Sequence, residues 1–104
     1  MVLSVLKYDV HPDKVEAYSK WTESGIKRTL ALPGVVEFRA YRPATGSSQV
    51  VVTTEWADMA AWAAAQSSEE NHKLMNEIRA LAINVSIEVW APSPVIPKPI
   101  RPGK

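Results

Sequence analysis

Four stretches of the chain alternate between apolar and polar residues with a period of two, the pattern of a half-buried β-strand. These stretches cover residues 2–11, 35–42, 49–56 and 84–91. In the first stretch, Leu6, Tyr8 and Val10 fall on one face of the predicted strand. A short connection containing glycine and serine joins the second and third stretches. We therefore expect these two strands to form a hairpin.

A helix is predicted between the first two strands, because apolar and small residues recur there every three or four positions. It begins at a capping box of Asp13 with Glu16 and ends before Pro33 and Gly34. The predicted inner face consists of Val15, Tyr18, Thr22, Ile26 and Leu30. This face is expected to pack on the sheet.

The second helical region, between the third and fourth strands, is predicted in two pieces. Asp58 can cap a short helix over residues 59–65, and Ser67 with Glu70 offers a capping box for the next helix. One stripe of that helix contains Asn71, Leu74, Met75, Ile78, Leu81 and Ala82. The serine-rich break can turn residues on either side of it toward one cleft.

The order strand, helix, strand, strand, helix, strand is typical of the ferredoxin-like βαββαβ fold. We predict an α+β protein with a four-stranded antiparallel sheet and two helical layers on one face. A single domain is expected over residues 1–91, followed by a proline-rich extended tail over 92–104. The uncovered sheet face carries charges of both signs with an apolar border. This pattern favours a homodimer formed through the sheet faces.

Composition excludes several classes of function. The 104 residues carry a formal net charge of +1, which gives no electrostatic reason to expect nucleic acid. There is no cysteine, so a thiol nucleophile and a thiolate metal site are excluded. His11 and His72 lack a matching carboxylate motif, and we predict no metal ion. The apolar start is too short to span a bilayer and lacks a signal-peptide pattern, so we expect a cytoplasmic protein without a membrane partner.

Short motifs follow one another in a characteristic order along the chain. They are His-Pro-Asp-Lys at 11–14, Leu-Pro-Gly-Val at 32–35, Glu-Trp at 55–56 and Ala-Asp at 57–58. Together they resemble the antibiotic-biosynthesis-monooxygenase family of the dimeric α/β-barrel superfamily, over residues 1–91. The resemblance implies a homodimer whose two sheets close into a barrel, with a ligand between helices and sheet in each protomer. Members include cofactor-free oxygenases of polycyclic aromatic compounds, haem-degrading monooxygenases and isomerase-like enzymes, so family membership leaves the chemistry open.

The predicted ligand site is an apolar cleft that would suit a flat aromatic molecule. Its ligand-binding walls are predicted to be Trp62, Trp21, Tyr8, Phe38 and Leu6. If the protein is an enzyme, the favoured reaction is oxygenation without a cofactor. His72 would then be the catalytic base or hydrogen-bond donor. The alternative for His72, at the border of its helix stripe, is a half-exposed surface position.

The sequence leaves two other functions open. Trp62, His72 and Lys73 match a spacing found in the haem-degrading branch, where the histidine ligates the haem iron. In that branch an asparagine stands on the first strand, at the position of Leu6, and leucine cannot hydrogen-bond to bound oxygen. We therefore predict no cofactor, with haem as the alternative. A third hypothesis is a non-catalytic binding or assembly module whose proline-rich tail contacts the partner protomer or another protein.

Overall fold

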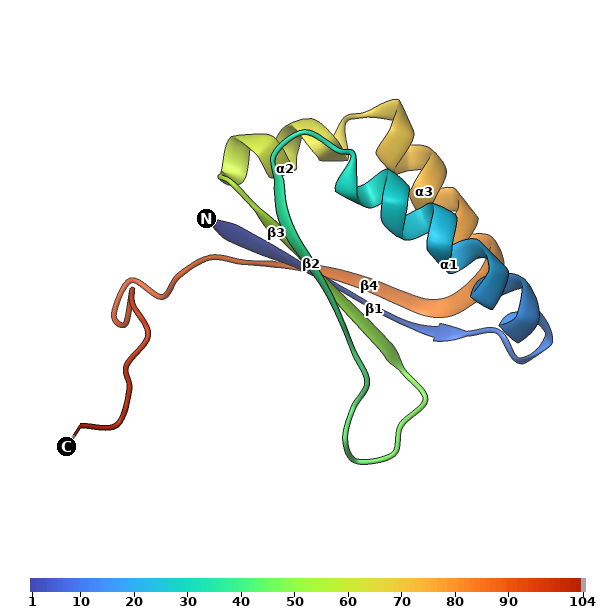
Figure 1. The fold of residues 1–104 in the computed structure, drawn as a ribbon, viewed down its shortest axis with the longest axis horizontal. Coiled ribbons are helices and arrows are strands. Elements are labelled where there is room, and N and C mark those ends of the chain that lie inside the picture. The colour runs from blue at the N-terminus through green and yellow to red at the C-terminus, as the bar shows by residue number, and fades with distance from the viewer. Residues whose placement is uncertain (104) are drawn as a thin grey trace.

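The computed structural model describes residues 1–103, and Lys104 lies outside the described residues. Its elements are β1 (Val2–Val10), a 3-10 turn (Pro12–Lys14), α1 (Val15–Leu30), β2 (Val35–Tyr41), β3 (Val50–Trp56), α2 (Met59–Gln66), α3 (Glu69–Leu81) and β4 (Ala82–Trp90). This order confirms the predicted ferredoxin-like α+β fold, with the second helical region divided into two helices (Figure 1).

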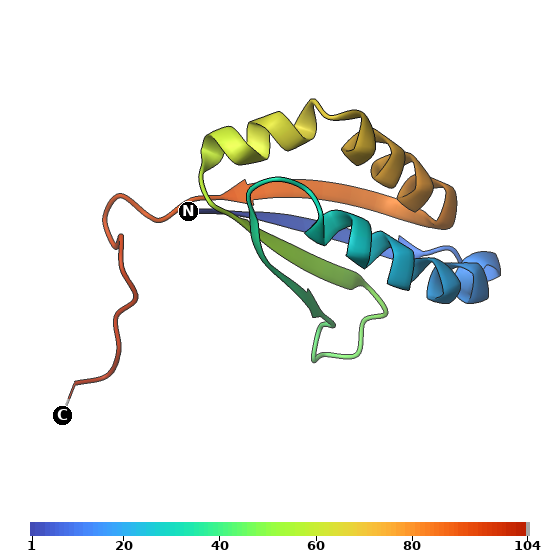
Figure 2. The ribbon, with the colours of Figure 1, turned by 45° about the horizontal axis from the view of Figure 1, so that its top comes forward.

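The four strands form one sheet in the order β2-β3-β1-β4, and every neighbouring pair is antiparallel. Leu6 at the centre of β1 pairs with Val52 of β3 and Ile87 of β4. The helices lie on one face of this sheet, with α1 and α3 side by side (Figures 1 and 2). In the part of the chain that the structure describes, no helix covers the other face of the sheet, so the protomer has two layers.

The helix starts agree with the sequence in part. Asp58 caps α2 by accepting a hydrogen bond of 2.8 Å from the Ala61 amide, as predicted. The cap of α3 is Ser68, one residue later than predicted, and it accepts from the Asn71 amide. The predicted capping box at Asp13 was wrong. Residues 12–14 form a separate 3-10 turn, so α1 begins at Val15 without a side-chain cap.

Buried apolar residues form two clusters, one toward each end of the layer between helices and sheet. The first contains Val2, Leu32, Trp56, Ala65 and Leu74, and the second contains Tyr8, Ile78 and Ala82. Beyond β4 the described residues form no helix or strand, and the tail leaves the body of the molecule (Figure 1). Within residues 1–103, none of the helices has the length and apolarity that crossing a membrane requires.

Candidate ligand cavity between helices and sheet

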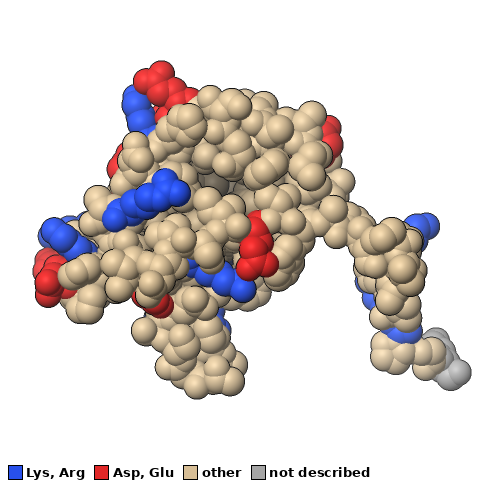
Figure 3. All heavy atoms as spheres, turned by 180° about the vertical axis from the view of Figure 1, so that it is seen from behind, with Lys and Arg blue, Asp and Glu red and all other residues tan. Residues whose placement is uncertain are grey.

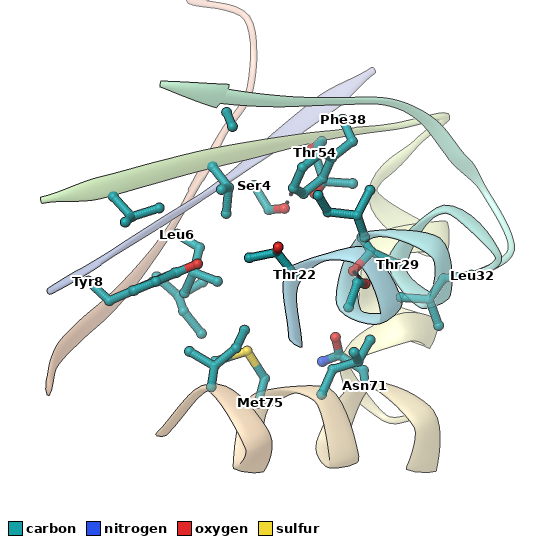
Figure 4. Close-up of a pocket in the computed structure, with 18 of the residues that line it drawn as sticks. Ser4, Leu6, Tyr8, Thr22, Thr29, Leu32, Phe38, Thr54, Asn71 and Met75 are labelled. Atoms are coloured by element: carbon teal, nitrogen blue, oxygen red, sulfur yellow. Dashed lines mark hydrogen bonds between the residues drawn. The ribbon is translucent and has the colours of Figure 1, made fainter. Parts of the chain in front are cut away.

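A cavity of about 200 Å³ lies between the helices and the sheet, and residues of both core clusters line it (Figure 4). Its lining comes from β1, β2, β3, α1 and α3, with Ile87 contributed by β4, Gln66 by the end of α2 and Leu32 by the connection after α1. Three residues of the lining, Ile26, Ala40 and Ile87, are exposed, so the cavity opens to the surface of the protomer. Seen from the back, the surface has a small hollow among uncharged residues, with a Lys or Arg side chain beside it (Figure 3).

Gly25 of α1 keeps space open beside the cavity. The indole ring of Trp21 lies directly over it, since a Cβ atom added at Gly25 would stand 2.5 Å from the nearest ring carbon. Only glycine lets a large ring lie this flat against its own helix. Trp21 and Gly25 both line the cavity. The short side chains of Thr22 and Thr29, on the same helix, also border it.

Tyr8 of β1 and Tyr18 of α1 join sheet and helix at one end of the cavity. Their hydroxyl oxygens are 2.6 Å apart, and their rings meet edge to face at a centroid distance of 5.8 Å. Tyr8 is only 2% exposed, and its hydroxyl points into the cavity in Figure 4. Burial, and then the hydrogen bond with Tyr18, raise the pKa of Tyr8 above its ordinary value of 10.0. Tyr8 is therefore a neutral hydrogen-bond donor at physiological pH.

The other hydroxyl groups of the lining are largely committed to the protein itself. Ser4 accepts a hydrogen bond of 3.0 Å from the Trp56 indole, while Thr22 and Thr29 donate to backbone carbonyls of α1. The half-buried Asn71 contributes a side-chain amide that has no hydrogen-bond partner among residues 1–103. Among residues 1–103, no Asp, Glu, Lys, Arg or His lines the cavity. The cavity is therefore apolar, with neutral hydrogen-bonding groups at a few points.

An ion-pair network connects α1 to α3. The Arg28 guanidinium donates two hydrogen bonds, of 2.7 and 2.8 Å, to Glu77 and a third, of 2.8 Å, to Glu70. The Trp21 indole also donates to Glu77, at 2.7 Å. The bonds from Arg28, followed by the bond from Trp21, lower the pKa of Glu77 from 4.5 to about 2. This network fixes the ring of Trp21, which is a wall of the cavity.

The model of the antibiotic biosynthesis monooxygenase family matches residues 1–77, which is well over half of the chain. The chain belongs to this family. No curated protein is similar enough in sequence to count as a match.

Solved structures show the same fold at low sequence identity. A putative antibiotic biosynthesis monooxygenase from Deinococcus radiodurans is similar with a TM-score of 0.77 at 10% identity, covering 100% of both chains. The N63A mutant of SnoaB, a cofactor-independent oxygenase from Streptomyces nogalater, has a TM-score of 0.70 at 20% identity, covering 93% of this chain and 97% of SnoaB. A conserved protein from Methanosarcina mazei Go1 has a TM-score of 0.73 at 19% identity, covering 86% and 89%.

Within this family fold, four of the predicted wall residues lie around the cavity. They are Leu6, Tyr8, Trp21 and Phe38. Their roles as ligand contacts stay predictions, because a bound ligand is needed to test them. Asn71 was predicted only as part of a helix stripe, although that stripe already put it on the inward face. The pairing of Tyr8 with Tyr18 had no signal in the sequence, because it joins two separate elements.

His72 and Trp62 lie outside the lining of the cavity. His72 is exposed on α3, and its Nε2 is 2.9 Å from the carbonyl oxygen of Gln66 at the end of α2. A carbonyl can only accept, so His72 donates and satisfies one of the last carbonyls of α2. Trp62 packs against the first core cluster, and its buried indole nitrogen has no partner among residues 1–103. The break between α2 and α3 therefore does not turn these two residues toward the cavity.

These positions do not suit a haem group held by His72. Its Nε2 already bonds to Gln66, and the imidazole is on the outer surface. Leu6 lines the cavity at the position where a hydrogen-bonding residue would be needed. The volume of about 200 Å³ is also below the 300–1,000 Å³ common for pockets that hold drug-sized ligands.

Proposed function

We propose that the protein is a cofactor-independent monooxygenase acting on a hydrophobic aromatic molecule bound in the cavity between helices and sheet. The observation that carries this proposal is the cavity lining, which is apolar and holds neutral hydrogen-bonding groups. Such a lining binds an uncharged flat molecule and excludes water from it. Membership of the antibiotic biosynthesis monooxygenase family, and the fold shared with the oxygenase SnoaB, support the same reaction class.

In this reaction the substrate supplies all the electrons. A ring CH₂ group next to an electron-rich aromatic system becomes C=O, and it takes one atom of molecular oxygen. The other oxygen atom leaves as water with the two hydrogens of that carbon. The protein binds and orients the substrate, and its neutral donors stabilise negative charge that develops on a substrate oxygen.

Oxygen uptake tests this proposal directly. The protein is incubated with a panel of quinol- and anthrone-type compounds that have one, two or three rings, and oxygen consumption and product are measured together. For an anthrone we expect one oxygen molecule consumed per carbonyl formed, with no hydrogen peroxide. No uptake above the spontaneous rate across the panel would exclude the proposed activity.

A matched pair of variants ties the activity to the cavity. Met75 lines the cavity, whereas Met59 is exposed at the start of α2. Met75→Trp fills the cavity and should reduce uptake at least tenfold, while Met59→Trp should leave it unchanged. Equal activity in the two variants would place the reaction somewhere else on the molecule.

We also propose that the protein functions as a homodimer through the face of the sheet that has no helix. Tyr41 and Trp90 are about half exposed there, and the ion pair of Lys7 with Glu88 lies between strands β1 and β4. Large exposed aromatic groups at the border of a charged surface are common in interfaces. Val51 stands on this face, paired across the sheet with Lys7.

Molar mass measured by light scattering tests the dimer. Val51→Lys adds an unpaired positive charge beside Lys7 and should give a monomer, whereas Val15→Lys on the exposed surface of α1 should remain dimeric. A wild-type monomer at micromolar concentration would overturn the proposal. A chain ending at residue 91 tests the alternative that the tail holds the protomers together, and we expect it to remain dimeric.

A further inference from the structure

The Tyr8–Tyr18 pair has one hydroxyl hydrogen that the pair itself does not use. One tyrosine donates to the other across the 2.6 Å contact, which leaves the second O–H available. No other hydrogen bond involves either hydroxyl within residues 1–103. Both tyrosines line the cavity, and the Tyr8 hydroxyl points into it (Figure 4). The arrangement in which Tyr18 donates to Tyr8 therefore leaves Tyr8 to donate into the cavity.

This donor is stronger than an isolated tyrosine. A hydroxyl that accepts a hydrogen bond becomes a better donor itself, because the two bonds polarise each other. The surroundings of Tyr8 are apolar, since Ile78 and Ala82 pack in the same cluster. A ligand that places an oxygen at this end satisfies the free O–H, whereas a pure hydrocarbon leaves it buried without a partner.

The size of the cavity limits the ring system. An apolar cavity of about 150 Å³ in another protein holds one benzene molecule. The present cavity, about 200 Å³, is larger by a modest amount. It therefore has room for one or two fused rings, and a third ring would project beyond the cavity.

We propose that the cavity selects one- or two-ring aromatic compounds with a phenol or carbonyl oxygen that accepts a hydrogen bond from the Tyr8–Tyr18 pair. This inference deepens the proposed function by naming its substrate class, and it rests on the same cavity. Tyr8 acts here as a specificity-determining residue that contacts the substrate oxygen. Tyr18 is a positioning residue that acts through Tyr8.

Binding measured without oxygen tests the inference separately from catalysis. The probes are 1-naphthol and naphthalene, which differ by one hydroxyl, and their dissociation constants are measured anaerobically by calorimetry. We expect wild-type protein to bind 1-naphthol about tenfold more tightly than naphthalene. Tyr8→Phe should abolish this preference without changing naphthalene binding, and Tyr18→Phe should weaken it about threefold.

Tyr41→Phe is the matched control, because Tyr41 is exposed and does not line the cavity. It should keep the full preference. A preference that survives in Tyr8→Phe, or a wild-type preference below twofold, would overturn the assignment. Naphthalene binding also reports whether each variant is folded, so a lost preference cannot be confused with a lost fold.

The ring limit is tested with 9-phenanthrol, which has three fused rings and one hydroxyl. We expect it to bind no more tightly than 1-naphthol, because its third ring lies in solvent. Tenfold tighter binding would contradict the limit. If the protein shows no oxygen uptake but keeps its preference for 1-naphthol, the proposed oxygenase activity is wrong and the binding inference stands. If it takes up oxygen but shows no preference for 1-naphthol, the binding inference is wrong and the oxygenase proposal stands.

Discussion

The two faces of the sheet are built from the same strands, but they differ in what covers them. On one face, Leu6, Tyr8 and Val52 lie under α1 and α3 and border the cavity. On the other face, Lys7 pairs with Glu88, and Arg39 pairs with Glu37. These ion pairs are one third to two thirds exposed and contribute little to protomer stability.

Because of this difference, we assign folding of the protomer to the helix-covered face and association to the open face. Burial of apolar groups under the helices is the main source of stability for the protomer, at about 25 cal/mol per Å². The open face instead offers exposed aromatic groups and charges of both signs, which favour a specific partner surface. Substitutions on the two faces should therefore change different measured quantities.

The largest expected effect comes from the helix-covered face. Leu74 is 3% exposed in the first core cluster, so Leu74→Ala removes buried contacts and leaves a void. We expect a loss of about 3 kcal/mol in the free energy of unfolding, measured by urea denaturation. Trp90→Ala on the open face should cost under about 0.5 kcal/mol in the protomer, because Trp90 is 48% exposed. Similar losses for both would mean that the open face is also a folding core.

Gly25→Ala should give the next largest effect, and it alters the cavity itself. In the middle of a helix this change normally stabilises by about 0.5–1 kcal/mol. Here the new methyl group would collide with the Trp21 ring, so we expect a net loss of about 1–2 kcal/mol. The displaced ring should also weaken naphthol binding. Net stabilisation with unchanged binding would show that Trp21 has another position available.

Glu77→Gln should have a smaller effect that depends on pH. The pKa of Glu77 is lowered in the fold from 4.5 to about 2, so its stabilisation is fully present above about 4.5. This contribution is lost as the pH falls toward 2. The side chain is 38% exposed, which reduces the expected contribution to about 0.5–1 kcal/mol.

Thermal unfolding from pH 7 to pH 2 measures this contribution. Glu77→Gln should lower the melting temperature at pH 7 by a few degrees, with the difference from wild type shrinking toward pH 2. Glu23→Gln is the control, since Glu23 forms only an exposed ion pair with Lys27 on α1. A constant difference at all pH values would argue against the carboxylate as its source.

His72→Ala is expected to have the smallest effect. It removes one exposed hydrogen bond to Gln66, worth about 0.5 kcal/mol, and the better helix propensity of alanine offsets part of that loss. Oxygen uptake should change less than twofold, since His72 is outside the cavity. A tenfold loss of uptake in a folded variant would instead support the catalytic role predicted from the sequence.

The first residues of the helices show which features local sequence patterns can predict. The cap at Asp58 was predicted correctly because a single side chain and a nearby amide define it. Ser67 and Ser68 are equally good capping residues in isolation, and the structure uses Ser68. At Asp13 the neighbouring Pro12 begins a 3-10 turn, and His11 Nδ1 accepts from the Asp13 amide. Local sequence therefore predicted each helix, but not its first residue in every case.

Local sequence patterns also predicted the candidate site only in part. Leu6, Tyr8 and Phe38 were predicted as walls from the alternation of their strands, and all three line the cavity. Trp62 and His72 were chosen from spacing within one helical region. Their directions depend on how α2 meets α3, which sequence spacing does not specify. The hydrogen bond from His72 to Gln66 holds that junction and keeps the imidazole on the surface.

The sequence by itself determined the order of strands and helices and many of the residues that face inward, because these follow from periods of 2.0 and 3.6 residues. Val15 and Leu30, at the two ends of α1, were predicted on its inner face but are more than half exposed. Only the tertiary structure decided which inward residues meet. Tyr8 and Tyr18 belong to different elements, and their 2.6 Å contact exists only once α1 lies on β1. The flat position of Trp21 over Gly25 likewise depends on Glu77 and Arg28 from both helices. The cavity is the space that these long-range contacts leave unfilled, and no local pattern encodes it.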